Sequence, residues 1–376
     1  MAGLHAAEQL ARNGMEVGLF ERNGSHAPTR RTLIVTPAFR RVLSAEASEL
    51  HRVGIMGLAS TEEERQVRLE ETDPVVERSA IIGEQRRRAR AAGVSFFTGC
   101  RFRRFESHAA NGTLRAVFDS KHGTLQAAAS RAVIGADGVK GSVGPAAGIG
   151  RPPAVPIVQA EVLLPTSWDP NLTKVWFDRN QTRFFYWLIP ESETRGVIGL
   201  IGDQAAGMRR SLDRFIQRLD LSPCAYQGAQ VALHHPRYRP WGRLGSVPVY
   251  LVGDAAGHVK VTTVGGAVTG LVGAQAAARS ILRRTSYKEE LKPLKKELDL
   301  HWLIRFALDR LDNRGYNQLL RAISTRVQGF LGRHDRDSMR RVFWRLPLLE
   351  PRLIRVGLRS AFSGSRRSNP AFKGGC

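Results

Sequence analysis

The sequence has little cysteine and no recognisable metal-binding pattern. Its three cysteines, among 376 residues, show neither paired spacing nor a Cys-x-x-Cys motif. A disulfide framework and a cysteine-based metal site are therefore not expected. At the N-terminus no cationic segment precedes an apolar stretch, so no secretory signal is predicted. This composition fits a reducing, cytoplasmic environment.

One uncharged stretch, residues 261–278, could be mistaken for a membrane span. It contains two adjacent threonines, a glutamine and several glycines, which make a poor lipid-facing helix. We interpret it as part of a buried helix in the core.

Acidic residues are few relative to basic ones. The chain has 57 Lys and Arg against 34 Asp and Glu, a formal net charge of +23. Such an excess attracts polyanions of any kind, and after Glu350 the chain has six cations and no acid. Two interpretations stay open, a solvated basic tail and peripheral association with an anionic membrane on its inner face. Nucleic acid is not an expected partner, because aromatic and basic residues do not interleave as in a reader module.

The most informative segment is residues 253–266, which read GDAAGHVKVTTVGG and follow an apolar run. A buried strand that ends in an acid and opens through glycines into a long helix suits a flavin. The Asp254 carboxylate would accept hydrogen bonds from a ribityl chain. Gly265 and Gly266 would let the backbone approach an aromatic ring, at the positive end of a helix from about Gly266 to Ser280.

Two further segments support this interpretation. Residues 3–14 predict a helix that ends at Asn-Gly, and a short strand from Met15 to Phe20 closes at Glu21. This is the second half of a dinucleotide-binding unit, in which the acid binds the ribose hydroxyls of an adenosine. Further on, the apolar residues 132–134 lead into Gly135-Ala136-Asp137-Gly138, a second turn from a strand to an acid.

With these motifs the chain resembles the flavoprotein superfamily of p-hydroxybenzoate hydroxylase architecture, and within it the geranylgeranyl reductase family. The segment 253–266 and the strand 185–190, read as FYWLIP, carry the resemblance to that family, as does the arginine-rich region around 305–359. The resemblance implies an α/β fold: a Rossmann-like, three-layer FAD-binding domain, an antiparallel-sheet substrate domain and a helical C-terminal region. The cofactor would be FAD, and the electron donor NADPH or a ferredoxin.

The resemblance and the motifs together give candidate site residues. Those expected to bind FAD are Gly3, Glu21, Arg78, Asp137, Gly138, Gly253, Asp254, Gly257, Gly265 and Gly266. Phe185 and Trp187 are expected to contact substrate, while His258 and Lys260 are candidates for proton delivery or for holding an anionic head group. A solvated lysine and a structural loop histidine are the alternatives at the last two positions.

The expected domain organisation divides the chain into four parts. Residues 1–150 form the first part of the FAD-binding domain, with 41–65 as a variable helical crossing. Residues 151–245 form the substrate domain, 246–284 the second part of the FAD-binding domain, and 285–376 a basic helical region.

Three functions remain open at this stage. Reduced FAD could hydrogenate carbon–carbon double bonds of a polyprenyl lipid, the function that the resemblance favours. It could instead activate dioxygen in an aromatic monooxygenase or halogenase, although no lysine occurs before Lys121, where a halogenase would need one. The third alternative is a flavoprotein fold that serves as a scaffold without catalysis.

Met1 is not expected to be the natural start. The family opens with an apolar strand and Gly-x-Gly-x-x-Gly, and Met1-Ala2-Gly3 fits only the last three positions of that motif.

Overall fold

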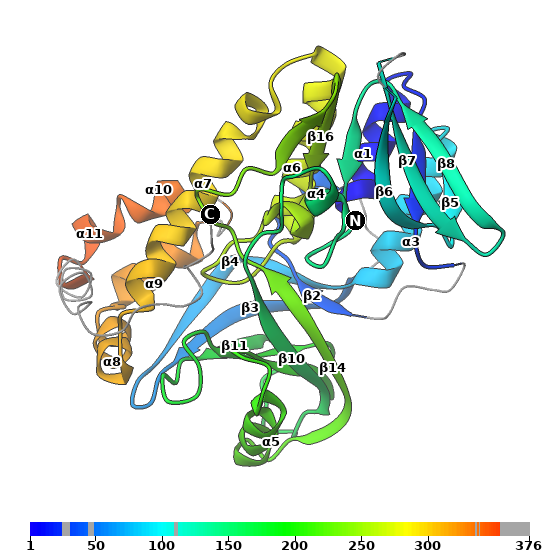
Figure 1. The fold of residues 1–376 in the computed structure, drawn as a ribbon. Coiled ribbons are helices and arrows are strands. Elements are labelled where there is room, and N and C mark those ends of the chain that lie inside the picture. The colour runs from blue at the N-terminus through cyan, green and yellow to red at the C-terminus, as the bar shows by residue number, and fades with distance from the viewer. Residues whose placement is uncertain (25–30, 44–48, 109–111, 335–336, 338, 354–376) are drawn as a thin grey trace.

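The computed structural model describes residues 1–24, 31–43, 49–108, 112–334, 337 and 339–353. The fold is mixed α/β. Figure 1 shows one large sheet below, a group of smaller sheets with helices α1, α3 and α6 above it, and the C-terminal helices along one side.

Small sheets build the upper part of the molecule. One is parallel and two-stranded, and pairs β1 with β5. A second has the order β15-β16-β9, in which β16 and β9 run parallel, and a third is the antiparallel meander β6-β7-β8. Their strands are β1 Gly18–Glu21, β5 Ser95–Thr98, β6 Arg101–His108, β7 Thr113–Ser120, β8 Gly123–Ala129, β9 Val133–Gly135, β15 Trp241–Leu244 and β16 Val247–Leu251.

The large sheet has eight strands in the order β14-β10-β13-β12-β11-β3-β4-β2. All its neighbours are antiparallel except β11 and β3. Its strands are β2 Thr32–Ile34, β3 Glu49–Ala59, β4 Glu64–Glu77, β10 Ala154–Leu163, β11 Leu172–Trp176, β12 Tyr186–Pro190, β13 Arg195–Ile201 and β14 Ser222–Ala232.

Residue alternation gives the large sheet two apolar faces. Successive side chains of a strand point to opposite faces, so Tyr186 and Leu188 pack with helix α5, Met208–Arg218, in one core cluster. Phe185 and Trp187 belong to a different cluster, which includes Val261 and Val264 of the segment before α6. The second face therefore meets the glycine-rich segment singled out in the sequence.

Helix α6, Ala267–Arg283, lies at the centre of the upper part. It packs against α1, Ala2–Arg12, and against α7, Tyr287–Leu308. Its small residues Ala274, Ala276 and Ala277 are almost fully buried between these helices, because alanine lets helix backbones approach closely. The remaining helices are α2 Ala38–Val42, α3 Arg78–Ala91, α4 Val143–Ala146, α8 Asn313–Arg321, α9 Thr325–Gly332, α10 Met339–Phe343 and α11 Leu346–Leu349, with the 3-10 turn η1 Gly253–Ala256.

The structure differs from the sequence expectation at residues 41–65. This range was expected to be a helical crossing, but apart from the end of α2 its described residues form β3 and the start of β4, two strands of the large sheet. Val53 is fully buried there and Ile55 nearly so. Among the described helices, none combines the length and the apolar character that crossing a membrane requires.

Candidate functional site

The ends of the parallel strands β9 and β16 come together at one edge of their sheet. The backbone N–H of Val252 donates to the carbonyl of Gly135 over 3.0 Å, which aligns the two strand-to-acid turns. Gly253 follows with φ 63°, and a Cβ there would lie 3.0 Å from the Cβ of Ala2. Glycine is therefore required where the turn η1 meets the start of α1.

Asp254 has an unused carboxylate. Its side chain is exposed, and it forms no hydrogen bond with a described residue. Nevertheless the surrounding protein raises the pKa of this carboxyl above its ordinary value, mainly by desolvation, while Arg78 acts in the opposite direction. An accessible acid in poorly hydrated surroundings suits a site that a ligand completes.

Arg78 and Glu21 lie in the same electrostatic neighbourhood as Asp254. Desolvation lowers the pKa of the half-buried Arg78, Arg31 adds to this, and both Asp254 and Glu21 oppose it. Glu77 positions Arg78 at the first residue of α3, because its side chain caps the helix by accepting from the amides of Ser79 and Ala80. The fold thus gathers three residues that the sequence places far apart.

The two glycines before α6 differ in their surroundings. At Gly266 a Cβ would stand 2.9 Å from Val259 Cγ2 and 3.4 Å from Asp254 Oδ1, whereas at Gly265 it would meet nothing closer than 3.4 Å. Gly265 also accepts a hydrogen bond from the amide of Lys260 over 3.0 Å. The acid and the glycine pair therefore form one cradle at the N-terminus of α6.

Val264 adds strain to this cradle. Its φ is 53°, in the left-handed region that β-branched residues avoid. Its side chain packs in the cluster of Phe185 and Trp187. Strain of this kind is found at functional sites, where the surrounding structure holds it in place.

Three other predicted residues, Asp137, Gly138 and Gly3, fix the backbone conformation beside the site. The Asp137 carboxylate accepts from the amides of Ser142, over 2.6 Å, and Val143, over 2.9 Å. Gly138 has φ 80°, and a Cβ on Gly3 would lie 2.7 Å from the Cβ of Ala136. These contacts hold the loop after β9 against α1.

The turn after Asp254 depends on Gly257. It adopts φ 64°, and a Cβ there would lie 3.1 Å from the carbonyl oxygen of Leu233 and 3.1 Å from Pro152 Cβ. Gly257 therefore packs the turn against the segments that join the two parts of the molecule.

His258 and Lys260 are both buried and engaged with protein. Burial lowers the pKa of His258 to about 3, so the imidazole is neutral. Its ring lies against α6, where a Cβ on Gly273 would be 2.0 Å from Nδ1. The Lys260 ammonium forms an ion pair with Asp337, which also accepts from the Thr36 hydroxyl. Their catalytic roles stay predictions.

Sequence reasoning missed two histidine contacts. His301 on α7 lies 2.6 Å from Thr262 Oγ1 through Nδ1 and 3.7 Å from Glu297 through Nε2. The i,i+4 spacing of Glu297 and His301 on one helix was the available signal. The second is His234, whose Nε2 lies 2.7 Å from Asp299 Oδ1.

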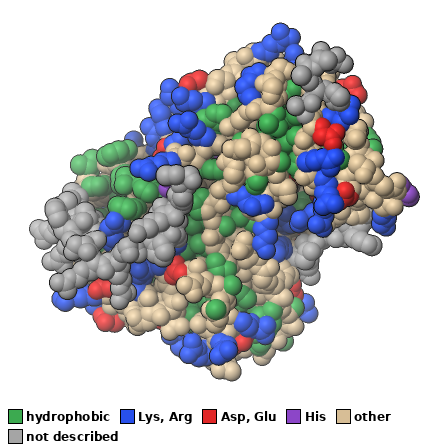
Figure 2. Space-filling model, in the orientation of Figure 1, with side chains coloured by type: hydrophobic (Ala, Val, Ile, Leu, Met, Phe, Trp, Pro, Cys, Tyr) green, Lys and Arg blue, Asp and Glu red, His purple; other side chains and the backbone are tan. Residues whose placement is uncertain are grey.

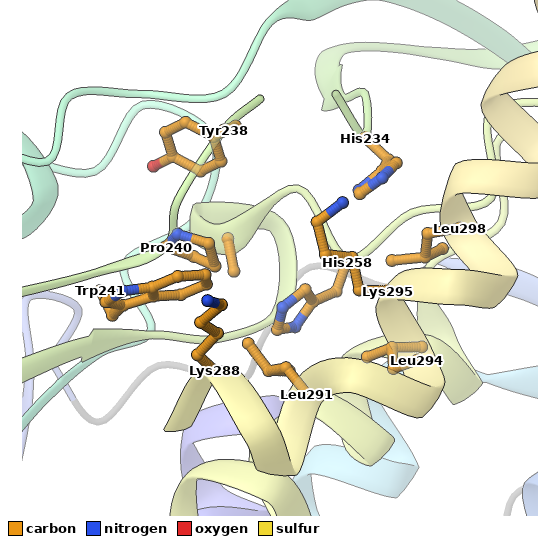
Figure 3. Close-up of a pocket in the computed structure, with 11 residues that line it drawn as sticks. His234, Tyr238, Pro240, Trp241, His258, Lys288, Leu291, Leu294, Lys295 and Leu298 are labelled. Atoms are coloured by element: carbon orange, nitrogen blue, oxygen red, sulfur yellow. The ribbon is translucent and has the colours of Figure 1, made fainter. Parts of the chain in front are cut away.

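A small, partly open pocket lies between α7 and the segment 234–241 (Figure 3). Leucines and lysines of α7 form one wall, and Tyr238, Trp241 and His258 contribute to the other. Asp254 and the glycine pair do not line it. Beside this pocket the Asp299 carboxylate contacts both His234 and Lys295. The charges of Asp299 and Lys295 therefore compensate each other. In the part of the chain that the structure describes, no group of three potential metal ligands occurs.

Comparison with known families identifies the cofactor class of the chain. The family described as FAD binding domain matches residues 1–283. The chain belongs to this FAD-binding family. The fold is that of flavin-dependent monooxygenases and reductases. No curated protein sequence matches the chain.

Solved structures share the fold at low sequence identity. A geranylgeranyl bacteriochlorophyll reductase-like protein from Thermoplasma acidophilum has a TM-score of 0.79 at 18% identity, over 94% of this chain and 96% of that protein. CmlS, a flavin-dependent halogenase, has a TM-score of 0.62 at 15% identity, over 97% and 72% of the two chains. Aklavinone-11 hydroxylase, solved with FAD and aklavinone, has a TM-score of 0.57 at 18% identity, over 82% and 66%.

The residues present fit FAD. The Asp254 carboxylate accepts no hydrogen bond from a described residue, and Gly266 lies beside it at the N-terminus of the long helix α6. Arg78 lies near enough to interact electrostatically with both Asp254 and Glu21. The family thus accounts for the carboxylate and the cradle that the fold leaves without a protein partner.

Proposed function

We propose that this FAD-binding protein reduces carbon–carbon double bonds of a polyprenyl lipid of the geranylgeranyl type. The observation that carries the proposal is the apolar second face of the large sheet. Phe184, Phe185 and Ile201 are buried there, and Trp187 packs with them. This aromatic cluster packs against Val261 and Val264, which lead directly into the cofactor cradle. A polyprenyl chain is the kind of substrate that such apolar surroundings would bind.

The similarity to the reductase-like protein of Thermoplasma acidophilum supports the same function. It extends over nearly the full length of both chains, with a higher TM-score than the halogenase and the hydroxylase. In addition, no lysine occurs before Lys121. A halogenase would need a lysine in that part of the chain to capture hypohalous acid, so its absence favours reduction over halogenation.

In this proposal the cofactor and the residues around it have separate roles. FAD, when bound and reduced, would supply a hydride to one carbon of a double bond, and a proton from solvent would add to the other carbon. Asp254 holds the ribityl chain, Glu21 and Arg78 the adenosine and diphosphate side, and Gly265 and Gly266 keep their amides at the helix N-terminus. Phe185 and Trp187 position the apolar chain and exclude water. A nicotinamide or a ferredoxin restores the reduced cofactor.

The test is anaerobic reduction of the FAD-loaded protein, incubation with a geranylgeranyl lipid in detergent, and mass spectrometry of the product. Each reduced double bond adds the mass of two hydrogens. Trp187→Ala should lower the rate, while Trp168→Ala, an aromatic residue on the α5 face of the same sheet, should retain it. An unreacted lipid, together with steady oxygen consumption in air on an aromatic substrate, would instead indicate a monooxygenase.

A further inference from the structure

The C-terminal helices α10 and α11 expose an unusual pair of apolar side chains. Trp344 is 70% exposed and Leu348 81%, and these values exceed those of all other exposed large hydrophobic residues that the structure describes. Single exposed leucines are common on protein surfaces. A tryptophan and a leucine four residues apart in one short segment, both more than two-thirds exposed, are a different case.

This pair is held in a fixed orientation by the opposite side of the same segment. Val342 is almost completely buried, and Leu346 and Leu349 pack against the core cluster of Leu320, Ile323 and Val327. The segment is therefore anchored to α8 and α9. Because residues 342, 346 and 349 are directed inward, residues 344, 345 and 348 are presented to the outside.

Arginines accompany the exposed pair. Arg340 and Arg345 are exposed on α10 and beside Trp344, and neither forms an ion pair with a described residue. Residues 313–353 contain nine arginines and three acids. Two of these acids already form ion pairs, Asp337 with Lys260 and Glu350 with Arg352. In Figure 2, hydrophobic side chains gather at the left edge, where Figure 1 places α10 and α11, with Lys and Arg side chains nearby.

We infer that the α10–α11 surface, defined by Arg340, Trp344, Arg345 and Leu348, docks on an anionic lipid membrane. Tryptophan and leucine side chains enter the interfacial region, and arginines bind lipid phosphates from the same side. The charge of the region favours such a lipid surface over a second copy of this equally basic chain. The inference deepens the proposed function, since a polyprenyl substrate dissolves in the membrane on which the enzyme would dock.

The test is flotation of the full-length protein with vesicles of phosphatidylcholine, with and without one third phosphatidylglycerol. We expect binding to the anionic vesicles only, weakened by added salt. Arg340→Gln with Arg345→Gln should lower the partition coefficient roughly fivefold for each arginine. Trp344→Ser with Leu348→Ser should lower it about tenfold or more.

Matched variants elsewhere serve as controls. Arg214→Gln with Arg218→Gln removes the same charge from α5, and Leu163→Ser removes a leucine that is 45% exposed at the end of β10. Both should bind vesicles nearly as the wild type does. All variants replace exposed side chains, and their unfolding temperatures should confirm that they are folded.

Several outcomes would overturn the inference. Equal binding to neutral vesicles, or unchanged binding in the Trp344 and Leu348 variant, would remove the role of this surface. A dimer in sedimentation that this variant abolishes, without vesicle binding, would assign the surface to a second copy. Because flotation requires no turnover, loss of docking and loss of double-bond reduction are separate results.

Discussion

The imidazole of His258 rests directly on Gly273 of α6. A Cβ on residue 273 would lie 2.0 Å from His258 Nδ1 and 2.3 Å from Cε1, a distance at which a side chain or a helix must move. The contact matters for the cofactor cradle, because His258 ends the turn that begins at Gly253. Its carbonyl also accepts from the Thr269 hydroxyl over 2.6 Å, so the turn is fixed to α6 at two points.

Gly273→Ala should therefore displace the His258 ring and with it the turn that forms part of the cradle. We expect a loss of about 1–3 kcal/mol in unfolding free energy, as for other overpacked cores, together with weaker FAD binding. Urea unfolding and fluorescence titration with FAD measure the two effects. Gly270→Ala is the matched control, because its Cβ would meet only Gly253 Cα at 3.4 Å and alanine favours the helix. Equal stability of the two variants would contradict the contact.

Asp254→Ala should reduce FAD affinity without unfolding the protein. A hydrogen bond to a charged group contributes about 1.5–3 kcal/mol, which corresponds to a loss of roughly tenfold to a hundredfold. The carboxylate has no hydrogen-bonding partner among the described residues, so the apo protein should stay folded. Glu16→Ala, an exposed acid in the same part of the chain, should leave the affinity unchanged. Wild-type affinity in Asp254→Ala would place the cofactor elsewhere.

Asp254→Asn should make the apo protein more stable at neutral pH. The folded-state pKa of this carboxyl is raised above the ordinary 3.8, mainly by desolvation. Its contribution to stability is thus present at low pH and is lost as the pH rises through the raised pKa. The asparagine variant avoids this loss, so its advantage in unfolding temperature should shrink from pH 7.5 toward pH 4. A variant that is less stable than the wild type at pH 7.5 would show that the carboxylate is stabilising.

Local patterns in the sequence predicted some elements well. The helix expected from about Gly266 to Ser280 is observed as Ala267–Arg283, and the strand expected to close at Glu21 is observed as Gly18–Glu21. In each case an apolar run, a turn residue and a helix or strand period are contiguous in the chain. Such signals need no knowledge of distant residues.

Strand β3 shows why other elements could not be predicted. Gly54 and Gly57 suggest breaks, but each allows a close approach of β11: a Cβ on Gly54 would lie 3.0 Å from Asn171 Oδ1, and one on Gly57 3.1 Å from Lys174 Cγ. The parallel pairing with β11 joins residues more than a hundred positions apart. The contacts of His234 with Asp299 and of Lys260 with Asp337 are equally non-local.

His301 should make stability depend on pH in the opposite direction to Asp254. Burial, assisted by Lys260, lowers its pKa to about 3 from an ordinary 6.5. Between these values the unfolded chain binds a proton that the folded protein does not, so stability falls as the pH falls, by up to about 1.4 kcal/mol per pH unit. Urea unfolding from pH 5 to 7.5 gives the slope of the unfolding free energy against pH. For His301→Asn this slope should be smaller than for the wild type by the equivalent of one bound proton.

Thr262→Val is the control for this measurement. It removes the hydroxyl that lies 2.6 Å from His301 Nδ1 but keeps the titrating imidazole. We therefore expect Thr262→Val to lose about 1 kcal/mol at pH 7.5 and to retain the wild-type slope. Parallel curves for the wild type and His301→Asn would mean that the imidazole takes up a proton in the folded protein. The buried link from the cofactor loop through Thr262 to α7 would then carry charge below about pH 6.5, and Glu297, 3.7 Å from His301 Nε2, would be its partner.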